Sequence, residues 1–495
     1  MKTMKSMTTL IKSASLVWVL MFAVAALSPA QAKSAPESFA DLADKLLPAV
    51  VNISTTQVIE SRGGQEMPQF PPGSPFEEFF KDFLDKNAPQ GDQPKRRKAT
   101  SLGSGFIIDY RTNGDTYVVT NNHVVQDADE VYVILHDDTR MKADIVGRDA
   151  KTDLAVLKVH ADRKLSSVPF GNSSTARVGD WVVAIGNPFG LGGTVTAGII
   201  SARGRDINAG PYDDFIQTDA SINRGNSGGP MFNMNGEVIG INTAIYSPSG
   251  GSVGIGFAIP SSAAEPVIKQ LIKHGQVQRG WLGVHIQVVT EPIAETLGLK
   301  KAEGALVASV IADGPAAKAG IKPRDVILEF DGRSVTEMRQ LPRIVAATEV
   351  DRAVSVKVWR DGAMKTLKVA IGKLQETDEV AQAAGDAPKD AVEDKPVTID
   401  ALGLDVSLLS DALRERFRLP DGVDGVVIVD VDASGPAYEE GVRPGDVLAE
   451  VSQEKVSSSD DVKRLVGVAK KAGKRSVLLL VETQGGFRFV AVRLR

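Results

Sequence analysis

The sequence predicts a mostly β protein of several domains, in which a strand-rich domain is followed by two copies of one smaller unit. Short β-branched runs, such as Tyr117 to Thr120 and Leu154 to Val159, are bounded by Gly, Asp or Asn. The chain of 495 residues also contains 47 Gly and 25 Pro, so turns are frequent. A third observation is a gapless internal repeat in the last 200 residues. Many short strands with such turns favour a barrel or sandwich over alternating βαβ units.

The first 32 residues have the pattern of a secretory signal peptide. Lys2, Lys5 and Lys12 precede an apolar stretch from Ala14 to Leu27, and Ala30-Gln31-Ala32 follows as a cleavage site of the A-x-A type. A transmembrane anchor is the alternative, but 14 apolar residues are too few to span a bilayer core that needs about 20. The sequence therefore predicts export with cleavage after Ala32.

Residues 33–102 are predicted to form an N-terminal segment that includes a flexible, Pro-rich insertion at 60–100. The insertion contains a short stripe of apolar side chains at helical spacing, which favours packing against the same domain or a neighbouring subunit. That stripe consists of Phe76, Phe79, Phe80, Phe83 and Leu84. The basic run from Lys95 to Lys98 is expected to be a solvated loop.

A strand-rich domain is predicted at 103–265. Asn235-Gly236 before Val238 is a strong β-hairpin signal within it. The repeat follows: residues 304–329 align without a gap to residues 425–450. Eleven of the 26 positions are identical, including Gly314 with Gly435 and Asp325 with Asp446. We therefore assign one domain to 278–373, a flexible acidic linker to 374–397 and a second copy of the domain to 398–495.

Composition excludes several classes of function. The 57 basic and 62 acidic residues give a formal charge of −5 without a basic stripe, so nucleic-acid binding is not expected. Cysteine is absent, which excludes disulfides, thiolate metal sites and cysteine nucleophiles. The sequence contains neither a phosphate-binding Gly-rich loop nor a metal-ligand cluster, so we expect no cofactor and no metal.

The densest motif is Gly225-Asn226-Ser227-Gly228-Gly229-Pro230. A serine hydroxyl attacks a carbonyl only when a base takes its proton, and the developing oxyanion needs N–H donors. Glycines beside a serine allow neighbouring N–H groups to converge, whereas the alternative is a plain Gly-rich turn. The motif also satisfies the G-x-S-x-G elbow of α/β hydrolases. That elbow requires a following helix, and here a strand and a tight turn follow instead.

A base and an orienting carboxylate can be found from the strands that precede them. His123 is the one of five histidines that directly follows an apolar strand, and Asp153 opens the next such strand. Asp149 lies in the preceding turn and is the competing carboxylate. In a triad the carboxylate orients the imidazole, the imidazole takes the proton, and Ser227 attacks.

The order His, Asp, Ser on a strand-rich background is the chymotrypsin arrangement. With the two repeats, the chain resembles the HtrA/DegP family of exported serine endoproteases, and in particular its two-PDZ, DegP-like branch of MucD-type proteins. The resemblance implies a chymotrypsin-like double β-barrel protease domain followed by two PDZ domains of α+β type. It implies the triad His123, Asp153 and Ser227, with an oxyanion hole from the backbone N–H groups of Gly225, Asn226 and Ser227.

Further site residues are implied by the same resemblance. Thr243, Ile245, Tyr246 and Ile255 are expected to bind substrate, and the aliphatic walls suggest a preference for residues such as Val or Ile before the scissile bond. Arg205 is the expected regulatory sensor, with Arg203 as the alternative. Trp281, Leu282, Gly283 and Val284 are expected to bind peptide in the first PDZ domain, and Ala401 to Leu404 are their weaker counterpart. Asn226 stands where zymogen-activated relatives carry Asp, so activation by propeptide cleavage is not expected.

The predicted function is ATP-independent degradation of unfolded or misfolded exported proteins in the periplasm. Expected partners are such substrates and peptides with apolar C-termini, in a homotrimer or larger homo-oligomer without stable membrane insertion. The alternative from another class is a chaperone or PDZ scaffold whose barrel is catalytically silent, and both activities can coexist in one chain.

Overall fold

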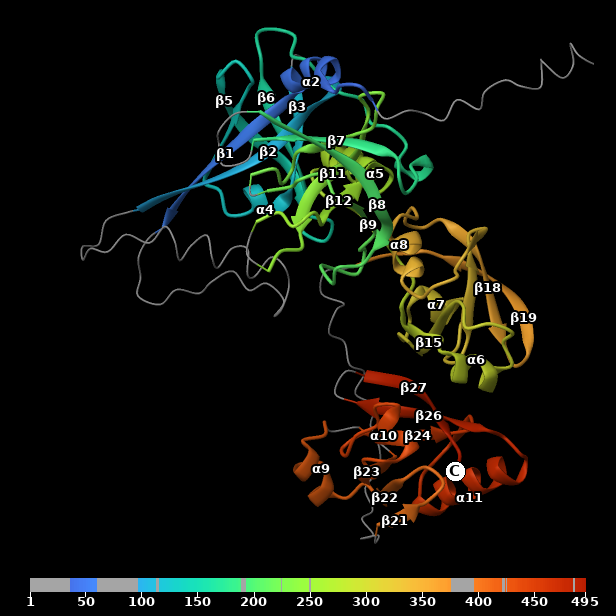
Figure 1. The fold of residues 1–495 in the computed structure, drawn as a ribbon. Helices are drawn as coiled ribbons and strands as arrows, with labels where there is room; N and C mark the ends of the chain where they lie inside the picture. Colours follow the sequence, from blue (N-terminus) through green and yellow to red (C-terminus); the bar gives the residue numbers. More distant parts are fainter. Residues whose placement is uncertain are drawn as a thin grey trace, which may run out of the picture.

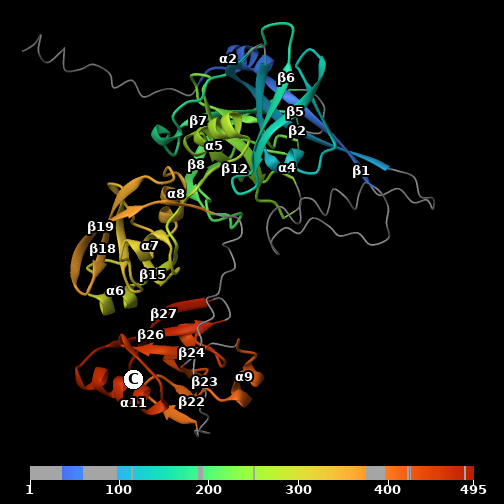
Figure 2. The ribbon, with the colours of Figure 1, turned by 180° about the vertical axis from the view of Figure 1, so that it is seen from behind.

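The structure is a computed structural model, and it describes residues 36–59, 97–112, 115–187, 193–223, 225–248, 251–374, 396–420, 423, 425–483 and 486–495. The predicted signal peptide, the Phe stripe and nearly all of the acidic linker lie outside these residues. Three bodies follow one another in space in chain order: a two-barrel domain, a first small domain and a second small domain (Figure 1). The view from behind shows the same sequence of bodies (Figure 2).

Two closed six-stranded barrels make up the first body. The first barrel has the order β1-β2-β3-β6-β5-β4, from Val50–Ile59, Arg97–Thr112, Asp115–Thr120, Leu154–His160, Arg140–Asp149 and Glu130–Ile134. The second has the order β10-β11-β12-β9-β8-β7, from Pro230–Phe232, Val238–Ile245, Gly256–Pro260, Phe215–Thr218, Thr194–Arg205 and Trp181–Gly186. The prediction of a mostly β chain with a chymotrypsin-like double barrel is confirmed.

The barrel body extends beyond the predicted limits 103 and 265. Strand β1 pairs with both β2 and β4, because a barrel closes only when every strand has two neighbours. Arg97 and Lys98 accordingly begin β2 opposite β1 and do not form a loop. At the other end, helix α5 (Ser261–His274) buries Ala264, Ile268 and Leu271 in the core between the barrels. The short helices of this body are α2 (Ala40–Leu46), η1 (Leu47–Ala49), α4 (Asn122–Val125) and η2 (Ser173–Thr175).

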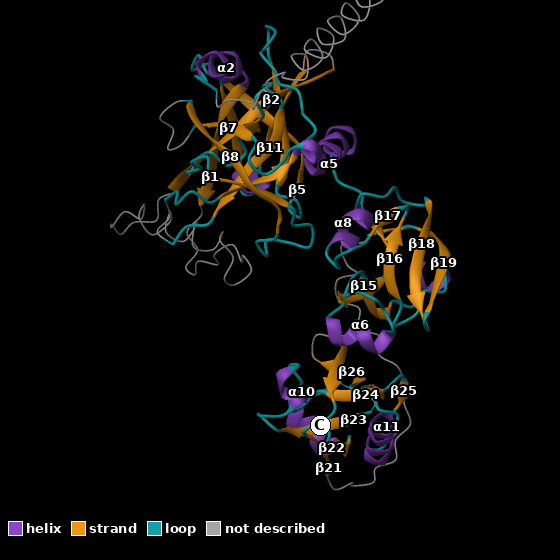
Figure 3. Cartoon of the chain, turned by 45° about the vertical axis from the view of Figure 1, so that its right-hand side comes forward, coloured by secondary structure: helices purple, strands orange, loops and turns teal. Residues whose placement is uncertain are grey.

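The two small domains share one plan of a curved sheet with short helices (Figure 3). In the first domain, β14-β15-β16-β18-β19 are Val284–Val288, Ala305–Val310, Val326–Phe330, Ala353–Arg360 and Ala363–Ala370. The separate strands β13 (Gly280–Trp281) and β20 (Gly372–Lys373) pair with each other, and β17 (Arg333–Ser334) pairs with β16. Its helices are α6 (Glu291–Leu297), α7 (Pro315–Lys318) and α8 (Gln340–Ala346).

The second small domain repeats this sheet with one additional strand. The order is β21-β22-β23-β24-β26-β27, from Val397–Ile399, Leu404–Leu408, Val426–Val431, Val447–Val451, Ser476–Thr483 and Gly486–Arg493. Strand β25 (Glu454–Lys455) pairs with β24, and the helices are α9 (Asp411–Phe417), α10 (Pro436–Glu439) and α11 (Ser459–Lys471). Within the described residues no helix is long and apolar enough to cross a membrane.

Candidate active site

The three residues predicted as a triad come from a short helix and two loops at the junction of the two barrels. His123 lies on α4 directly after β3, and Asp153 directly precedes β6, so the first barrel carries both. Ser227 precedes β10 of the second barrel. Catalytic groups on loops that a rigid scaffold positions are a common arrangement in enzymes.

Asp153 is held in place by hydrogen bonds to both its main chain and its side chain. Its φ of 53° lies in the left-handed region, which is unusual for a residue with a side chain. Its carbonyl accepts from the Asn122 N–H at 3.2 Å and from Asn121 Nδ2 at 2.8 Å. Its carboxylate accepts from the His123 N–H at 2.9 Å and lies 2.7 Å from His123 Nδ1. This pairing fixes the imidazole so that Nε2 is the nitrogen available for proton transfer.

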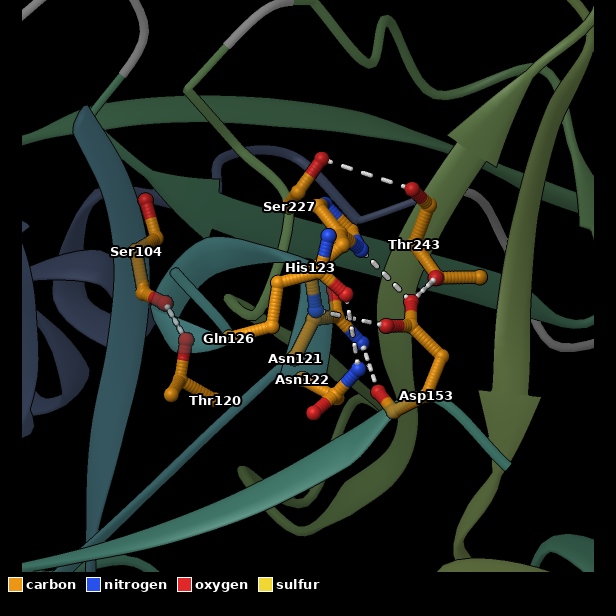
Figure 4. Close-up of polar contacts among 9 residues, drawn as sticks. All are labelled: Ser104, Thr120, Asn121, Asn122, His123, Gln126, Asp153, Ser227 and Thr243. Carbon is orange, nitrogen blue, oxygen red and sulfur yellow. Dashed lines mark hydrogen bonds and ion pairs between the residues drawn. The ribbon is translucent and has the colours of Figure 1, made fainter. Parts of the chain in front are cut away.

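Thr243 on β11 connects the carboxylate to the serine (Figure 4). Its hydroxyl donates to Asp153 Oδ2 at 2.6 Å, and its carbonyl accepts from Ser227 Oγ at 3.4 Å. The 3.4 Å contact is long for an O–H···O bond and leaves the serine hydroxyl easy to reorient. Thr243 was predicted among the substrate-binding residues, and that role stays a prediction. Its buried hydroxyl is hydrogen-bonded to Asp153 of the candidate triad.

The competing carboxylate Asp149 has a different set of partners. It forms a two-point ion pair with Arg279, with Oδ1 to Nη1 at 2.9 Å and Oδ2 to Nη2 at 2.5 Å, and both side chains are buried. Its Oδ2 also accepts from the N–H of Thr152 at 3.1 Å. Asp149 therefore supports the turn that carries Asp153 and connects it to the first small domain.

The serine loop contains a turn in which Gly225 has the positive φ that favours glycine. Gly225 has φ of 98°, and the N–H of Asn226 donates to the carbonyl of Asn223 at 3.0 Å, which closes the turn. This hydrogen bond already uses the Asn226 N–H. Of the three predicted donors to the oxyanion, the N–H groups of Gly225 and Ser227 therefore remain as candidates. The side chain of Asn226 is buried, and its Oδ1 has no hydrogen-bond partner among the described residues.

Ser104 on β2 is a site residue that the sequence reasoning missed. It is fully buried, and its hydroxyl donates to the Gly225 carbonyl at 2.6 Å and accepts from the Asn187 N–H at 2.8 Å. Its own N–H donates to the Ser227 carbonyl at 2.9 Å. A Cβ at Gly228 would come 2.3 Å from the Ser104 carbonyl oxygen, so glycine is required there. Ser104 therefore attaches the serine loop to the first barrel.

The predicted pocket residues lie at the end of β11 and on the following loop. Ile245 is half-buried against the core of the second barrel. The Tyr246 N–H donates to the Ile255 carbonyl at 3.0 Å, while the Tyr246 side chain is 56% exposed. Their role as walls of a specificity pocket stays a prediction. In the described part of the chain, no group of three or more His, Asp or Glu side chains is arranged to hold a metal ion.

The predicted sensor, Arg205, lies at the end of β8. Its Nε donates to Gln217 Oε1 at 2.9 Å, whereas the alternative, Arg203, donates to the Ala176 carbonyl at 2.6 Å. The loop that follows contacts α8 of the first small domain, where Arg343 pairs with Asp214 at 2.6 Å and Arg339 pairs with Asp206. Burial raises the pKa of Asp213 in this loop above its usual range.

A cavity of about 960 Å³ extends from the candidate triad to the first small domain. His123, Asp153 and Thr243 line it in the barrels, and Gln340 and Arg343 line it on and near α8. The loop that contacts α8 also contributes to its wall. His123 and Asp153 of the candidate triad therefore share one cavity with the first small domain.

Comparisons with known proteins agree with this architecture. Residues 103–241 match the model of the trypsin-like peptidase domain, and residues 280–371 and 401–481 each match the model of the PDZ domain. The chain is thus a chymotrypsin-like serine endopeptidase that carries two PDZ domains, which we call PDZ1 and PDZ2.

Curated relatives define the family more closely. A probable periplasmic serine endoprotease DegP-like of Brucella suis biovar 1 (strain 1330) is 46% identical, with 92% of this chain and 89% of the relative covered. The protein of the same name from Rhizobium meliloti (strain 1021) is 45% identical, with 93% and 92% covered. The chain belongs to this family of HtrA/DegP serine endoproteases.

Solved structures of this type are also similar. HtrA-type protease AlgW with tripeptide has a TM-score of 0.56 at 41% identity, with 69% of this chain and 99% of that one covered. HtrA-type protease AlgW with decapeptide has a TM-score of 0.54 at 41% identity, with 68% and 99% covered.

Proposed function

We propose that this endopeptidase degrades unfolded or misfolded exported proteins in the periplasm without ATP, as envelope quality control. The observation that supports it best is that His123, Asp153, Thr243 and Ser227 lie together between the two barrels. Asp153 is hydrogen-bonded to His123 and to the Thr243 hydroxyl, and the Ser227 hydroxyl contacts the Thr243 carbonyl. The relatives are named periplasmic, and the predicted signal peptide agrees with export to that compartment.

The proposed mechanism follows acyl-enzyme chemistry. His123 Nε2 takes the proton of Ser227 Oγ, which attacks the carbonyl carbon of the peptide bond. Asp153 stabilises the imidazolium that forms, and the N–H groups of Gly225 and Ser227 donate to the oxyanion. The imidazolium then gives its proton to the leaving amine, and water repeats the sequence to release the acyl group.

We propose PDZ1 as the receptor for peptide C-termini. Strand β14 is an edge strand of its sheet, and the loop from Trp281 to Val284 leads directly into it. Such an edge accepts a peptide as an added strand, and the loop N–H groups take the terminal carboxylate. The two AlgW structures, one with a tripeptide and one with a decapeptide, are consistent with a peptide receptor in this class of protein.

The test compares degradation of unfolded casein by the wild type and by Ser227→Ala. The variant removes the nucleophile and little volume, so turnover should fall on the order of 10⁴- to 10⁶-fold while the fold persists. Ser247→Ala, at a half-buried serine on the loop after β11, is the matched control and should cleave as the wild type does. Near-normal cleavage by Ser227→Ala would refute the protease assignment. Binding of casein without cleavage by the wild type would instead favour the scaffold alternative.

A further inference from the structure

The two PDZ domains differ at the edge of the sheet where a peptide would bind. In PDZ1, the edge strand β14 has β15 on one side only, within the described residues. In PDZ2, the corresponding strand β22 has β23 on one side and β21 on the other. The register of this additional pair is Val397 with Val406, Thr398 with Asp405 and Ile399 with Leu404.

Strand β21 has the direction of a PDZ ligand. It is antiparallel to β22, and its C-terminal end reaches the loop from Ala401 to Leu404. A ligand that is added to a PDZ domain as a strand also ends at this loop, because the loop N–H groups hold its carboxylate. Residues 397–399 therefore lie where the last three residues of a bound peptide would lie.

The carbonyl of Ile399 takes the place of the terminal carboxylate. It accepts from the N–H of Leu402 at 2.9 Å and from the N–H of Gly403 at 3.0 Å. The corresponding N–H groups of PDZ1, on Leu282 and Gly283, have no backbone acceptor among the described residues. The donors that would hold a peptide carboxylate are thus in use in PDZ2 and available in PDZ1.

The side chain of Ile399 fills the apolar pocket. It is 3% exposed and belongs to a core cluster that includes Val462, Leu465 and Val466 of α11. Val397, two residues earlier, packs against the same cluster. Helix α11 occupies the position in PDZ2 that α8 has in PDZ1, so β21 lies between the groove helix and β22, in contact with both.

The two PDZ domains differ in the residues that precede their carboxylate-binding loops. Arg279 in PDZ1 aligns with Ile399 in PDZ2 when the loop glycines, Gly283 and Gly403, are matched. The Arg279 side chain reaches the barrels to pair with Asp149, and its carbonyl accepts from the Leu374 N–H at 2.9 Å. The chain before the PDZ1 loop is therefore directed away from the groove, whereas in PDZ2 an apolar β-branched segment folds back into it.

We propose that residues 397–399 are an internal ligand that occupies the peptide groove of PDZ2 and closes it to free C-termini. From this segment we infer which peptides the groove would bind: extended chains with β-branched apolar residues at their last and third-last positions. The proposal rests on the proposed function only in taking a PDZ groove as a peptide receptor, and it is independent of the protease chemistry.

Crosslinking tests where the segment lies in the intact chain. The protein has no cysteine, so a single engineered pair reports one contact. Thr398→Cys with Asp405→Cys joins partners across β21 and β22, and mild oxidation should form the disulfide nearly completely. Thr398→Cys with Asp430→Cys is the control, because Asp430 lies one strand further away and should stay reduced. Equal crosslinking of both pairs, or of neither, would overturn the proposal.

Peptide titration tests whether the groove is closed. In a Ser227→Ala background, we expect a peptide that ends in a free Val-Thr-Ile to bind once per chain, at PDZ1. Val397→Ser with Ile399→Ser should raise this number to two, whereas the control Thr398→Ser, on an exposed side chain, should leave it at one. The proposal would be overturned if the protein with an unmodified PDZ2 bound two peptides per chain, or if the folded double variant bound only one. Failure of casein cleavage would refute the proposed function and leave both results unchanged.

Discussion

At the scale of single residues, Asp153 shows how the fold maintains an unfavourable local conformation. Its left-handed backbone costs on the order of 1–3 kcal/mol, and such a residue persists when its surroundings fix it. Hydrogen bonds from Asn121 and Asn122 fix the main chain, and those from His123 and Thr243 fix the carboxylate. The left-handed backbone of Asp153 and these hydrogen bonds together direct the carboxylate toward the imidazole.

Thr243→Val should lower kcat about tenfold and leave KM nearly unchanged. The substitution keeps the volume but removes the hydrogen bond to Asp153, and a bond to a charged group contributes about 1.5–3 kcal/mol. Thr243→Ser restores the hydroxyl and should recover most of the rate. Steady-state kinetics on a peptide reporter measure both constants. An unchanged kcat in Thr243→Val would show that the two bonds from His123 suffice.

At the scale of elements, helix α11 of PDZ2 begins with a side-chain cap that depends on ionisation. Ser458 precedes the helix, and its hydroxyl accepts from the Asp461 N–H at 3.2 Å. Asp461 in turn accepts from the N–H and hydroxyl of Ser457 at 3.2 and 3.0 Å. These hydrogen bonds, with that from Ser458 and the pair with Arg464, lower the pKa of Asp461 to about 2.

The lowered pKa gives a pH-dependence with a definite sign. Because the folded pKa lies below the usual value of 3.8, the ionised carboxylate stabilises PDZ2 above that value. The stabilisation is lost as the pH falls from about 4 through 2. Asp461→Asn should therefore unfold at lower urea concentration than the wild type at pH 7, and the two should converge near pH 2. A constant difference from pH 7 to pH 2 would contradict this assignment.

Local sequence patterns predicted the candidate triad but not the residues that support it. His123 and Asp153 each adjoin an apolar strand and Ser227 lies in a Gly-rich string, so their neighbours identify them. Ser104 is a small residue in a strand, and its partner Gly225 is 121 positions away. The predicted linker ends at 397 and so includes the first residue of β21, although Val397-Thr398-Ile399 is a β-branched run of the kind typical of strands. Its place in the PDZ2 groove depends on pairing that no local pattern specifies.

At the scale of the whole molecule, two interfaces connect the three bodies. The interface between the barrels and PDZ1 includes the buried pair of Arg279 and Asp149, with the Arg279 guanidinium 4.9 Å from the centroid of the Tyr212 ring. The pairs of Arg343 with Asp214 and of Arg339 with Asp206 belong to the same interface.

The interface between PDZ1 and PDZ2 includes an apolar cluster, contacts of Arg324 with Glu450 and the Gln453 carbonyl, and two hydrogen bonds between Gln287 and Phe489. Gln287 Nε2 donates to the Phe489 carbonyl at 2.9 Å, and Gln287 Oε1 accepts from the Phe489 N–H at 2.7 Å.

Arg279→Met should destabilise the protein by about 3–5 kcal/mol, because it leaves the carboxylate of Asp149 buried without a positively charged partner. The double variant with Asp149→Asn removes the unpaired charge and should recover part of that loss. Urea denaturation followed by tryptophan fluorescence measures both changes. Arg352→Met, which removes an exposed pair with Asp331, is the control and should cost less than about 1 kcal/mol. Equal losses in the two single variants would contradict a structural role for the buried pair.

The hairpin of β26 and β27 has apolar side chains on both faces, and this explains the docking of PDZ2. Val477 and Leu479 face the PDZ2 core, while Leu478 and Phe489 belong to the cluster shared with PDZ1. In the sequence this appears as the continuous apolar run from Val477 to Val481, in place of the alternation of a half-exposed strand. A strand of that kind is expected to be covered on both sides.

Phe489→Glu should therefore separate PDZ2 from PDZ1 without unfolding either domain. The side chain is 4% exposed and lies in the shared cluster, so a carboxylate there cannot stay desolvated without a partner. Phe487→Glu, two residues earlier on the same strand and 39% exposed, is the matched control. Small-angle scattering should give a larger radius of gyration for Phe489→Glu than for the wild type, and an unchanged one for Phe487→Glu. Since PDZ1 would keep its own groove, the Val-Thr-Ile peptide should still bind once per chain. An unchanged radius in Phe489→Glu would show that the apolar cluster does not hold the two domains together.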